Sequence, residues 1–257
     1  TQLFRSPLVS FAYERGWRQR FDWAGFPGRD KEFQMMMDLY EAGESTERAN
    51  GRGIALDVSC GTGLFSRKLL RCGRFVAVVA SDFSQAMLEQ TREYINSNSG
   101  SSIDGGSGSV SAASRPRDAD VAPLLLVRAD VGRLPFESAS FDLVHAGAAL
   151  HCWPNPSLAM AEISRVLKPG GVFIGSTFLL GASPLGQALG SDEPVRPFLE
   201  VEKELWRLTG GVNRGGVARF WEEQELMDLC RLCGLTGFTP KRDKRFIMFS
   251  ASKGRAE

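Results

Sequence analysis

A glycine-rich turn at residues 59–63 restricts the fold of this chain more than any other feature of its sequence. The turn follows a short apolar run, 54–58, in which Asp57 is the only acid, and it contains Gly61 and Gly63. An amphipathic run comes directly after it. A buried strand, a tight turn whose glycines let the backbone approach a ligand, and a helix form the unit on which open α/β sheets bind ligands.

Short apolar runs and amphipathic runs alternate along the rest of the chain. Runs rich in Val, Leu and Phe are typical of strands, and apolar residues three or four apart are typical of helices. This alternation predicts an α/β fold with a mostly parallel sheet and helices on both faces. The expected strands are 54–58, 75–79, 124–127, 141–145, 172–174, 235–240 and 246–251, and the expected helices are 30–41, a segment ending near 70, 84–95, 155–167 and 222–233.

The length of 257 residues fits one sizeable domain with a full core. Residues 53–257 carry the alternating pattern, and residues 1–52 are expected to form an aromatic and helical cap. The segment 96–120 is rich in Ser and Gly, which predicts a flexible surface insertion. The irregular stretch 179–220, with many Gly and Pro residues, predicts a lid or substrate segment.

The charge balance of the chain argues against nucleic acid as its main partner. Lys and Arg number 31 and Asp and Glu number 30, whereas a protein that grips phosphate backbones usually carries a basic excess. No apolar run reaches the ~20 residues of a membrane-spanning helix, and peripheral association with a membrane stays open. The chain begins at Thr1 rather than Met, so the removal of a targeting peptide also stays open.

The five cysteines are expected to be free thiols in a reducing compartment, because their number is odd and they are scattered. Cys230 and Cys233 form a C-x-x-C pattern. They fall with Leu226 and Leu229 on one helical face, so we interpret them as small core residues. A metal or redox site would need further ligands nearby, and none is predicted.

An acidic residue follows or ends each of three consecutive expected strands: Asp57, Asp82 and Asp130. Asp57 would repel a pyrophosphate but suits a cationic amino group, and the third glycine of a dinucleotide fingerprint is replaced by Ser66. Asp82 lies about 20 residues past the glycine turn, the spacing of a ribose-binding acid. Asp130 can accept a hydrogen bond from an adenine amino group. Alternatives remain: Asp57 as a strand end, and Asp82 as a helix-entry charge ahead of Ser84.

Five segments resemble, in order, the successive motifs of class I S-adenosylmethionine (SAM)-dependent methyltransferases: LDVSCGTG, SDFSQAML, RADVGRLPF, SFDLVHAGAALHCW and AEISRVLKPGGVF. The resemblance covers about residues 53–178 and is to the ubiquinone and menaquinone biosynthesis type. Two segments, ERGWRQRFDWAGFPG and AGAALHCWP, resemble a narrower set of chloroplast methyltransferases of plants and green algae. The resemblance implies a Rossmann-like class I methyltransferase fold with a seven-stranded sheet, SAM as cofactor, S-adenosyl-L-homocysteine as product, and a chloroplast location.

Carried over residue by residue, the resemblance implies a set of cofactor contacts. The methionine end of SAM would be held by Asp57, Gly61 and Gly63, the ribose by Asp82, the adenine ring by Phe83, the adenine edge by Asp130 and the Val131 backbone, and the amino-acid pocket would be completed by the backbone near Ala146. Ser59 stands where the family has its first glycine. A serine there costs little if its φ is negative, so we expect only a slight effect on cofactor affinity.

Methyl transfer from a sulfonium is an in-line displacement, in which a protein aligns the reactants, excludes water and in some cases supplies a base. The chain has two histidines. His145 lies within an expected strand and is interpreted as a packed, hydrogen-bonded residue. His151 falls in the loop beyond that strand, and our hypothesis is that it positions or deprotonates a hydroxyl or acidic carbon of the acceptor. Ordering of the loop that contains Cys152 and Trp153 is an equally good explanation for His151.

The same loop bears on the methyl acceptor, which is expected to be a small molecule. Residues 148–153 stand where enzymes that methylate amide or exocyclic amino nitrogens often carry Asn/Asp-Pro-Pro-aromatic, which argues against nucleobases and glutamine side chains. Tyr13, Trp17, Trp23 and Trp153 suit a flat or lipid-like acceptor such as a prenylated quinone or phenol. They suit an ordinary packed lid almost as well. The rival functions are a catalytically silent SAM-binding subunit with an assembly or regulatory role, and a nicotinamide-dependent reductase.

Overall fold

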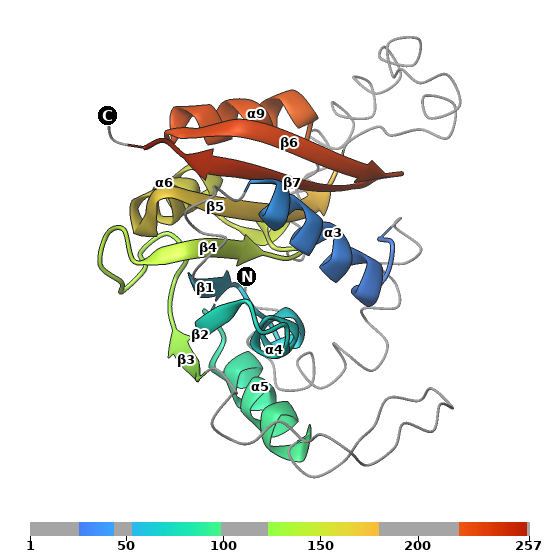
Figure 1. Cartoon of the computed structure of the whole chain (residues 1–257), viewed down its shortest axis with the longest axis vertical. Helices are drawn as coiled ribbons and strands as arrows, with labels where there is room; N and C mark the ends of the chain where they lie inside the picture. The colour runs from blue at the N-terminus through green and yellow to red at the C-terminus, as the bar shows by residue number, and fades with distance from the viewer. Residues whose placement is uncertain (1–25, 44–52, 99–122, 180–220, 256–257) are drawn as a thin grey trace.

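The computed structural model describes residues 26–43, 53–98, 123–179 and 221–255. They form a seven-stranded sheet in the order β3-β2-β1-β4-β5-β7-β6 (Figure 1). The neighbours among β3 (Leu124–Arg128), β2 (Phe75–Asp82), β1 (Gly53–Val58), β4 (Phe141–Ala146) and β5 (Leu167–Phe178) pair in parallel. β7 (Phe246–Lys253) pairs antiparallel with β5 and with β6 (Leu235–Asp243). The expected α/β fold with a mostly parallel sheet is confirmed.

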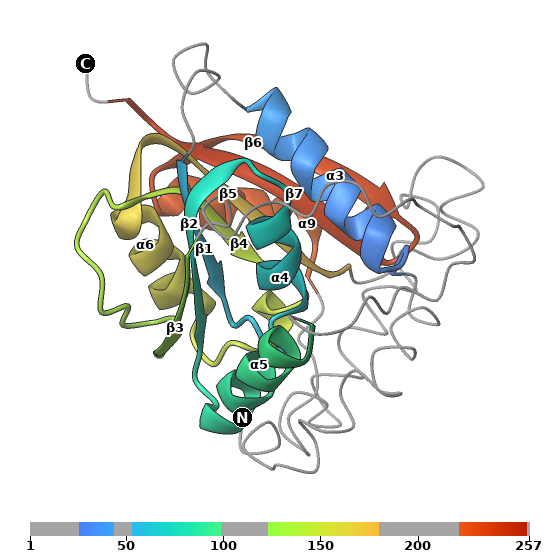
Figure 2. The same cartoon turned by 60° about the horizontal axis from the view of Figure 1, so that its bottom comes forward.

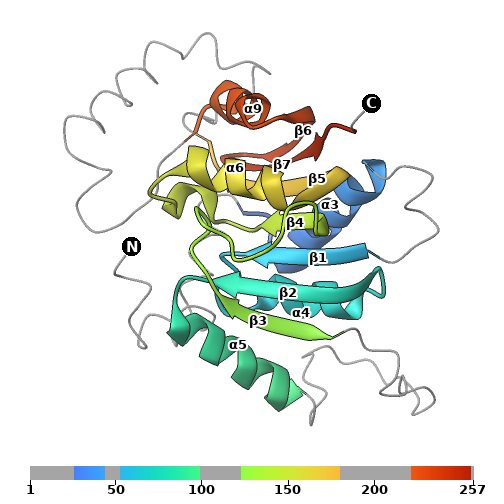
Figure 3. The same ribbon diagram turned by 90° about the vertical axis from the view of Figure 1, so that its left-hand side faces the viewer.

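Helices cover both faces of the sheet (Figures 2 and 3). One face carries α3 (Arg29–Ala42), α4 (Leu64–Arg71) and α5 (Gln85–Asn98), and the other carries α6 (Pro156–Val166) and α9 (Glu223–Leu232). The consecutive β4 residues Leu143 and Val144 are both fully buried and belong to two different apolar cores. Successive side chains of a strand point to opposite faces, so the apolar run of β4 reflects a sheet that is buried on both sides.

Local signals in the sequence set the helix ends. Asn155 accepts a hydrogen bond from the Leu158 N–H at 3.1 Å, and Pro156 occupies the first turn, so α6 begins where expected. Ser84 accepts from the Met87 N–H at 3.4 Å at the start of α5. Gly73, with φ +71°, follows the end of α4.

Several element boundaries differ from the expectation, and the start of β5 and the end of α5 show why. β5 begins at Leu167, which pairs with Phe141, and the register then shifts before Val172 pairs with Leu143. The Lys-Pro-Gly-Gly sequence between these two pairs interrupts the apolar run that marks a strand, so the sequence does not indicate the early start of β5. α5 extends to Asn98, so the first residues of the expected insertion 96–120 are helical. Residues 99–120 of that insertion, 180–220 of the expected lid, and all of the expected cap except 26–43 lie outside the described residues.

Within the described ranges, no helix is both long and apolar enough to cross a membrane. The same residues contain no group of three His, Cys, Asp or Glu side chains arranged to hold a metal ion. All five cysteines are free thiols. Cys230 is buried in the core beneath α9, and burial raises its pKa to about 12, which agrees with its interpretation as a small core residue.

Candidate cofactor site

A cavity of about 280 Å³ lies at the carboxyl ends of the parallel strands, close to the lower end of the volumes usual for ligand pockets. Parallel strands present these ends at one edge of the sheet, where open α/β folds bind ligands. The loops after β1, β2, β3 and β4 all contribute to its wall. The lining residues are Ser59, Gly61, Asp82, Phe83, Ser84, Met87, Ala129, Asp130, Val131, Gly147, Ala148, Ala149, Cys152, Trp153 and Pro154.

The turn after β1 has a left-handed backbone at three residues: Ser59 (φ +54°), Gly61 (φ +58°) and Gly63 (φ +73°). A serine at position 59 would cost little only if its φ were negative. The positive φ of Ser59 shows that this expectation is wrong. The strain is offset in part by a hydrogen bond, because the indole Nε1–H of Trp153 donates to Ser59 Oγ at 3.0 Å. This bond ties the glycine turn to the loop after β4.

Gly63 is required by packing against α5. A Cβ at this position would lie 2.3 Å from Thr91 Cγ2, closer than real Cβ contacts allow. Thr91 is fully buried, and its Oγ1 lies 3.1 Å from the carbonyl oxygen of Gly61. The turn and α5 are thus in direct contact. Gly63 itself does not line the cavity.

Asp82, at the end of β2, joins the glycine turn to the start of α5. Its Oδ2 accepts from the Gly61 N–H at 2.9 Å, and its Oδ1 accepts from the Ser84 N–H at 2.8 Å. Burial raises the pKa of this carboxyl from 3.8 to about 6, although both N–H donors favour the ionised form. A carboxylate oxygen can accept more than one hydrogen bond, so Asp82 still offers acceptors to a ligand in the cavity.

Asp57 has a different environment. It is almost fully buried, and its two oxygens are engaged by Ser66 Oγ at 2.5 Å and by His145 Nδ1 at 2.8 Å. Asp57 borders a second, much smaller cavity of about 20 Å³ rather than the large one. The Nε2 atom of His145 is buried and has no hydrogen-bond partner. The expectation that His145 is packed and hydrogen-bonded is confirmed by its burial and by the bond between Nδ1 and Asp57.

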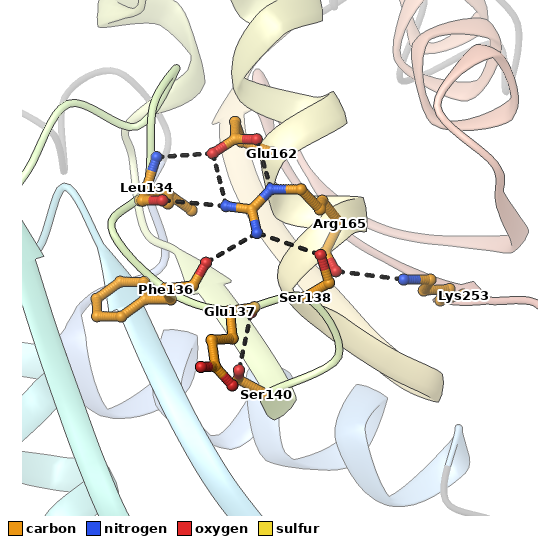
Figure 4. Close-up of polar contacts among 8 residues, drawn as sticks. All are labelled: Leu134, Phe136, Glu137, Ser138, Ser140, Glu162, Arg165 and Lys253. Carbon is orange, nitrogen blue, oxygen red and sulfur yellow. Dashed lines mark hydrogen bonds and ion pairs between the residues drawn. The ribbon is translucent and has the colours of Figure 1, made fainter.

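The wall after β3 contains Asp130 and Val131, and it is held by a side chain of α6 (Figure 4). Asp130 Oδ1 accepts from the Gly132 N–H at 2.9 Å. Arg165 donates to the carbonyl oxygens of Leu134 at 3.0 Å and Phe136 at 2.8 Å. Together with Glu162, which accepts from the Leu134 N–H at 2.8 Å, Arg165 fixes this loop to α6.

The loop after β4 lines the side of the cavity that faces away from β3. It contains the short helix η4 (Leu150–Cys152) and Trp153. His151 is buried, with Nδ1 3.2 Å from Thr177 Oγ1 and its ring 4.8 Å from that of Phe178. Burial lowers the pKa of His151 from 6.5 to about 4, so its imidazole is neutral at pH 7.

The structure brings most of the sequence-predicted site residues together. Seven of them line the large cavity: Ser59, Gly61, Asp82, Phe83, Asp130, Val131 and Trp153. Asp57 borders the small one. Gly63, Ala146 and His151 line neither, and Tyr13, Trp17 and Trp23 lie outside the described residues.

Sequence reasoning missed several lining residues. Met87 is a buried apolar residue of α5 that also lines the cavity, and apolar periodicity alone does not separate these two roles. Gly147 and Pro154 lie beyond the end of β4. Their proximity to a predicted strand end is the one signal in the sequence that indicates them.

Strand order, the antiparallel β7, the glycine turn after β1 and the acids after β1, β2 and β3 together form the Rossmann-like class I methyltransferase fold that the sequence resemblance implies. The chemistry of the site fits that cofactor. Asp82 presents acceptors suited to ribose hydroxyls, while Phe83, Met87 and Val131 offer apolar surface for a purine. His145, whose Nε2 has no hydrogen-bond partner, lines the small cavity.

Comparisons with known proteins agree with this class. Residues 56–175 match the family model described as a methyltransferase domain. An uncharacterized chloroplastic methyltransferase of Arabidopsis thaliana is 45% identical over 256 residues, 98% of this chain and 61% of that protein. A demethylmenaquinone methyltransferase of Staphylococcus aureus is 35% identical over 121 residues, 47% of this chain and 41% of that protein. The crystal structure of a SAM-dependent methyltransferase of Thermotoga maritima matches with a TM-score of 0.54 and 17% identity, covering 95% of this chain and 99% of that one.

Residues 56–175 therefore match a methyltransferase domain, and the fold is the one that SAM-dependent methyltransferases have. This match implies SAM as the cofactor. The Thermotoga structure, at its low identity, supports the fold. The chain spans 61% of the length of the Arabidopsis relative.

Proposed function

We propose that this protein transfers the methyl group of SAM to a small-molecule acceptor bound beside Trp153. The observation that supports this most directly is the two-sided cavity. Its β1, β2 and β3 side presents Asp82, an acid suited to ribose hydroxyls, and apolar surface suited to a purine. Its β4 side presents a loop of apolar residues ending in Trp153 and Pro154. Bound SAM would supply a sulfonium methyl that is open to nucleophilic attack. The protein would align the acceptor with that methyl and exclude water.

The cofactor contacts are proposed as the sequence resemblance implies them. The methionine end would contact Asp57, Gly61 and Gly63, and the backbone near Ala146 would complete the amino-acid pocket. The ribose would contact Asp82. The adenine would contact Phe83, Asp130 and Val131. The hydrogen bonds that Asp82 makes to Gly61 and Ser84 support its role, because they hold the carboxylate at the cavity wall.

The acceptor is proposed to be flat or lipid-like, such as a prenylated quinone or phenol. Support comes from the indole of Trp153 in the cavity wall and from the relationship to a demethylmenaquinone methyltransferase over 121 residues. Tyr13, Trp17 and Trp23 are proposed to complete the acceptor pocket. Location in a plastid is supported by the chloroplastic relative from Arabidopsis thaliana. Peripheral association with a membrane would bring a prenylated acceptor within reach.

Two roles are proposed for His151. As a base, it would be neutral at pH 7, but burial lowers its pKa to about 4 and so makes it a weak proton acceptor. As a structural residue, it would order the loop after β4 through its contacts with Thr177 and Phe178. The second role requires no rearrangement of the described residues and is the one that the geometry favours. A His151→Gln variant, which can keep a hydrogen bond to Thr177, distinguishes them: near-full turnover supports the structural role, and loss of turnover with unchanged acceptor KM supports the base.

The proposed function is tested by calorimetric titration with SAM and S-adenosylhomocysteine, followed by turnover assays with methyl-labelled SAM. Wild-type protein and Asp82→Ala are compared. We expect micromolar binding that is lost in the variant, and label transfer to demethylated quinones or phenols but not to nucleobases. Binding without transfer to any small-molecule acceptor would favour a catalytically silent subunit. No binding by folded wild-type protein would refute the proposal.

A further inference from the structure

One ring nitrogen of His145 is hydrogen-bonded, and the other has no partner. Its side chain is 1% exposed, and its Nδ1 lies 2.8 Å from Asp57 Oδ1. Its Nε2 has no hydrogen-bond partner. Buried polar atoms are nearly always satisfied in folded proteins, and one that is not often has a functional role. Nothing in the cofactor contacts described so far uses this nitrogen.

The hydrogen bonds around Asp57 determine which ring nitrogen of His145 carries the proton. Asp57 Oδ2 accepts from Ser66 Oγ at 2.5 Å, and Oδ1 faces His145 Nδ1. An ionised carboxylate can only accept, so Nδ1–H is the donor. In the neutral imidazole, Nε2 then carries a lone pair and is an acceptor. Asp57 and Ser66 thus orient the ring and fix its tautomer.

Nε2 lies close to Gly147, a residue that lines both the small cavity and the large one. The small cavity is lined by His145 together with Asp57, Ser59, Cys60, Thr62, Leu64, Phe65 and Gly147, and both Ser59 and Gly147 also line the large cavity. A Cβ on Gly147 would lie 2.8 Å from His145 Cε1 and 3.2 Å from Nε2. The absence of a side chain at Gly147 therefore leaves room beside this edge of the ring, in the small cavity.

The charges around this edge favour a cation over an anion. The pKa of the partly buried Cys60 thiol is raised, first by burial and then by the charges of Asp82 and Asp57. Arg67, a buried cation of α4, donates to the Thr62 carbonyl oxygen at 2.7 Å. An ammonium group is a donor with a positive charge, so it matches both the lone pair of Nε2 and the surrounding field.

We propose that His145 Nε2 accepts a hydrogen bond from the α-ammonium group of the methionine moiety of the cofactor, with Asp57 as the positioning residue that acts through His145. This rests on the proposed binding of SAM in the adjoining cavity. Asp57 thus recognises the amino group indirectly: its two oxygens are already engaged by Ser66 and His145, and the imidazole extends its reach toward the ligand.

The test compares ligands that carry or lack the amino-acid portion. Calorimetry would measure the affinity of wild-type protein, His145→Phe and Asp82→Asn for S-adenosylhomocysteine and for 5′-methylthioadenosine, which has no amino acid. His145→Phe is expected to weaken S-adenosylhomocysteine about 10- to 100-fold, as for loss of a hydrogen bond to a charged group, and to leave 5′-methylthioadenosine unchanged. Asp82→Asn should weaken both ligands.

Two analogues of S-adenosylhomocysteine identify the group that is recognised. The decarboxylated analogue, which keeps the amine, should show the same loss of affinity in His145→Phe. The deaminated analogue, which keeps the carboxylate, should show none. A loss confined to the deaminated analogue, an equal loss for 5′-methylthioadenosine, or wild-type affinity for S-adenosylhomocysteine would each overturn the proposal. If the wild-type protein binds neither nucleoside, the proposed function fails as well.

A measurement on the wild-type protein does not depend on the folding of a variant. The chain contains two histidines, so ¹⁵N-histidine labelling gives two imidazoles, and a His151→Gln sample assigns them. The Nε2 resonance of His145 should shift on addition of S-adenosylhomocysteine and stay in place with 5′-methylthioadenosine. Asp57→Asn should change the resting tautomer and reduce the shift. An unchanged His145 resonance in saturating S-adenosylhomocysteine would refute the contact.

Discussion

Replacing Gly63 by alanine tests whether packing against α5 dictates the glycine turn. The left-handed φ of +73° at Gly63 would cost an alanine about 1–2 kcal/mol. The added Cβ would also lie 2.3 Å from Thr91 Cγ2, and overpacking of this kind costs about 1–3 kcal/mol. Together, about 2–5 kcal/mol should be lost from the free energy of unfolding, measured by urea denaturation without ligand.

A matched control separates the two contributions. Gly73 has nearly the same φ, +71°, but a Cβ there would meet no atom within 4 Å, so Gly73→Ala should lose only the conformational part. Adding Thr91→Ser to Gly63→Ala removes the clashing methyl while it keeps the hydroxyl, and should recover most of the difference. If Gly63→Ala is no less stable than Gly73→Ala, or Thr91→Ser brings no recovery, the packing explanation is wrong.

The remaining predictions concern charge and hydrogen bonds in the cavity wall. Asp82 has a folded pKa of about 6, above its unfolded value of 3.8, so its contribution to stability is fully present below pH 3.8 and is lost as the pH rises through 6. The difference in unfolding free energy between the wild type and Asp82→Asn should therefore decrease as the pH rises from 3.8 to about 6. A difference that stays constant over this range would contradict the raised pKa of Asp82. Arg165→Met should lose about 1–3 kcal/mol of stability, because it leaves the loop carbonyls of Leu134 and Phe136 without their donor. Arg165→Lys should restore little of this loss, since an ammonium cannot reach both carbonyl oxygens. Full recovery by lysine in urea denaturation would refute this. Ser59→Gly relieves the left-handed strain but removes the acceptor of the Trp153 indole, so in thermal melts it should stabilise the protein more in a Trp153→Phe background than in the wild type; equal effects would show that the bond is unimportant.

The elements of this fold could be predicted because each has its own local signal. Asn155 and Pro156 mark the start of α6, and the apolar runs mark the strands. β5 was predicted too short, since a strand that continues through Lys-Pro-Gly-Gly depends on pairing with Phe141, a partner distant in the sequence.

The site was predicted to the extent that its residues follow strand ends. Asp82 and Asp130 line the cavity as expected for acids after parallel strands. The pairing of Asp57 with His145 could not be predicted, because it depends on the register of β1 against β4. The positive φ of Ser59 and its bond to Trp153 depend equally on how two distant loops meet.

Helix α6 constrains how this protein can diversify. Its first residue follows directly on the loop that contains Trp153 and Pro154, and near its other end Arg165 holds the loop that carries Asp130. A mutation that shifts this helix to admit a new acceptor would therefore also disturb the purine wall. New acceptor preferences should accumulate by side-chain replacement within a fixed frame, while the length and the anchoring of α6 are maintained.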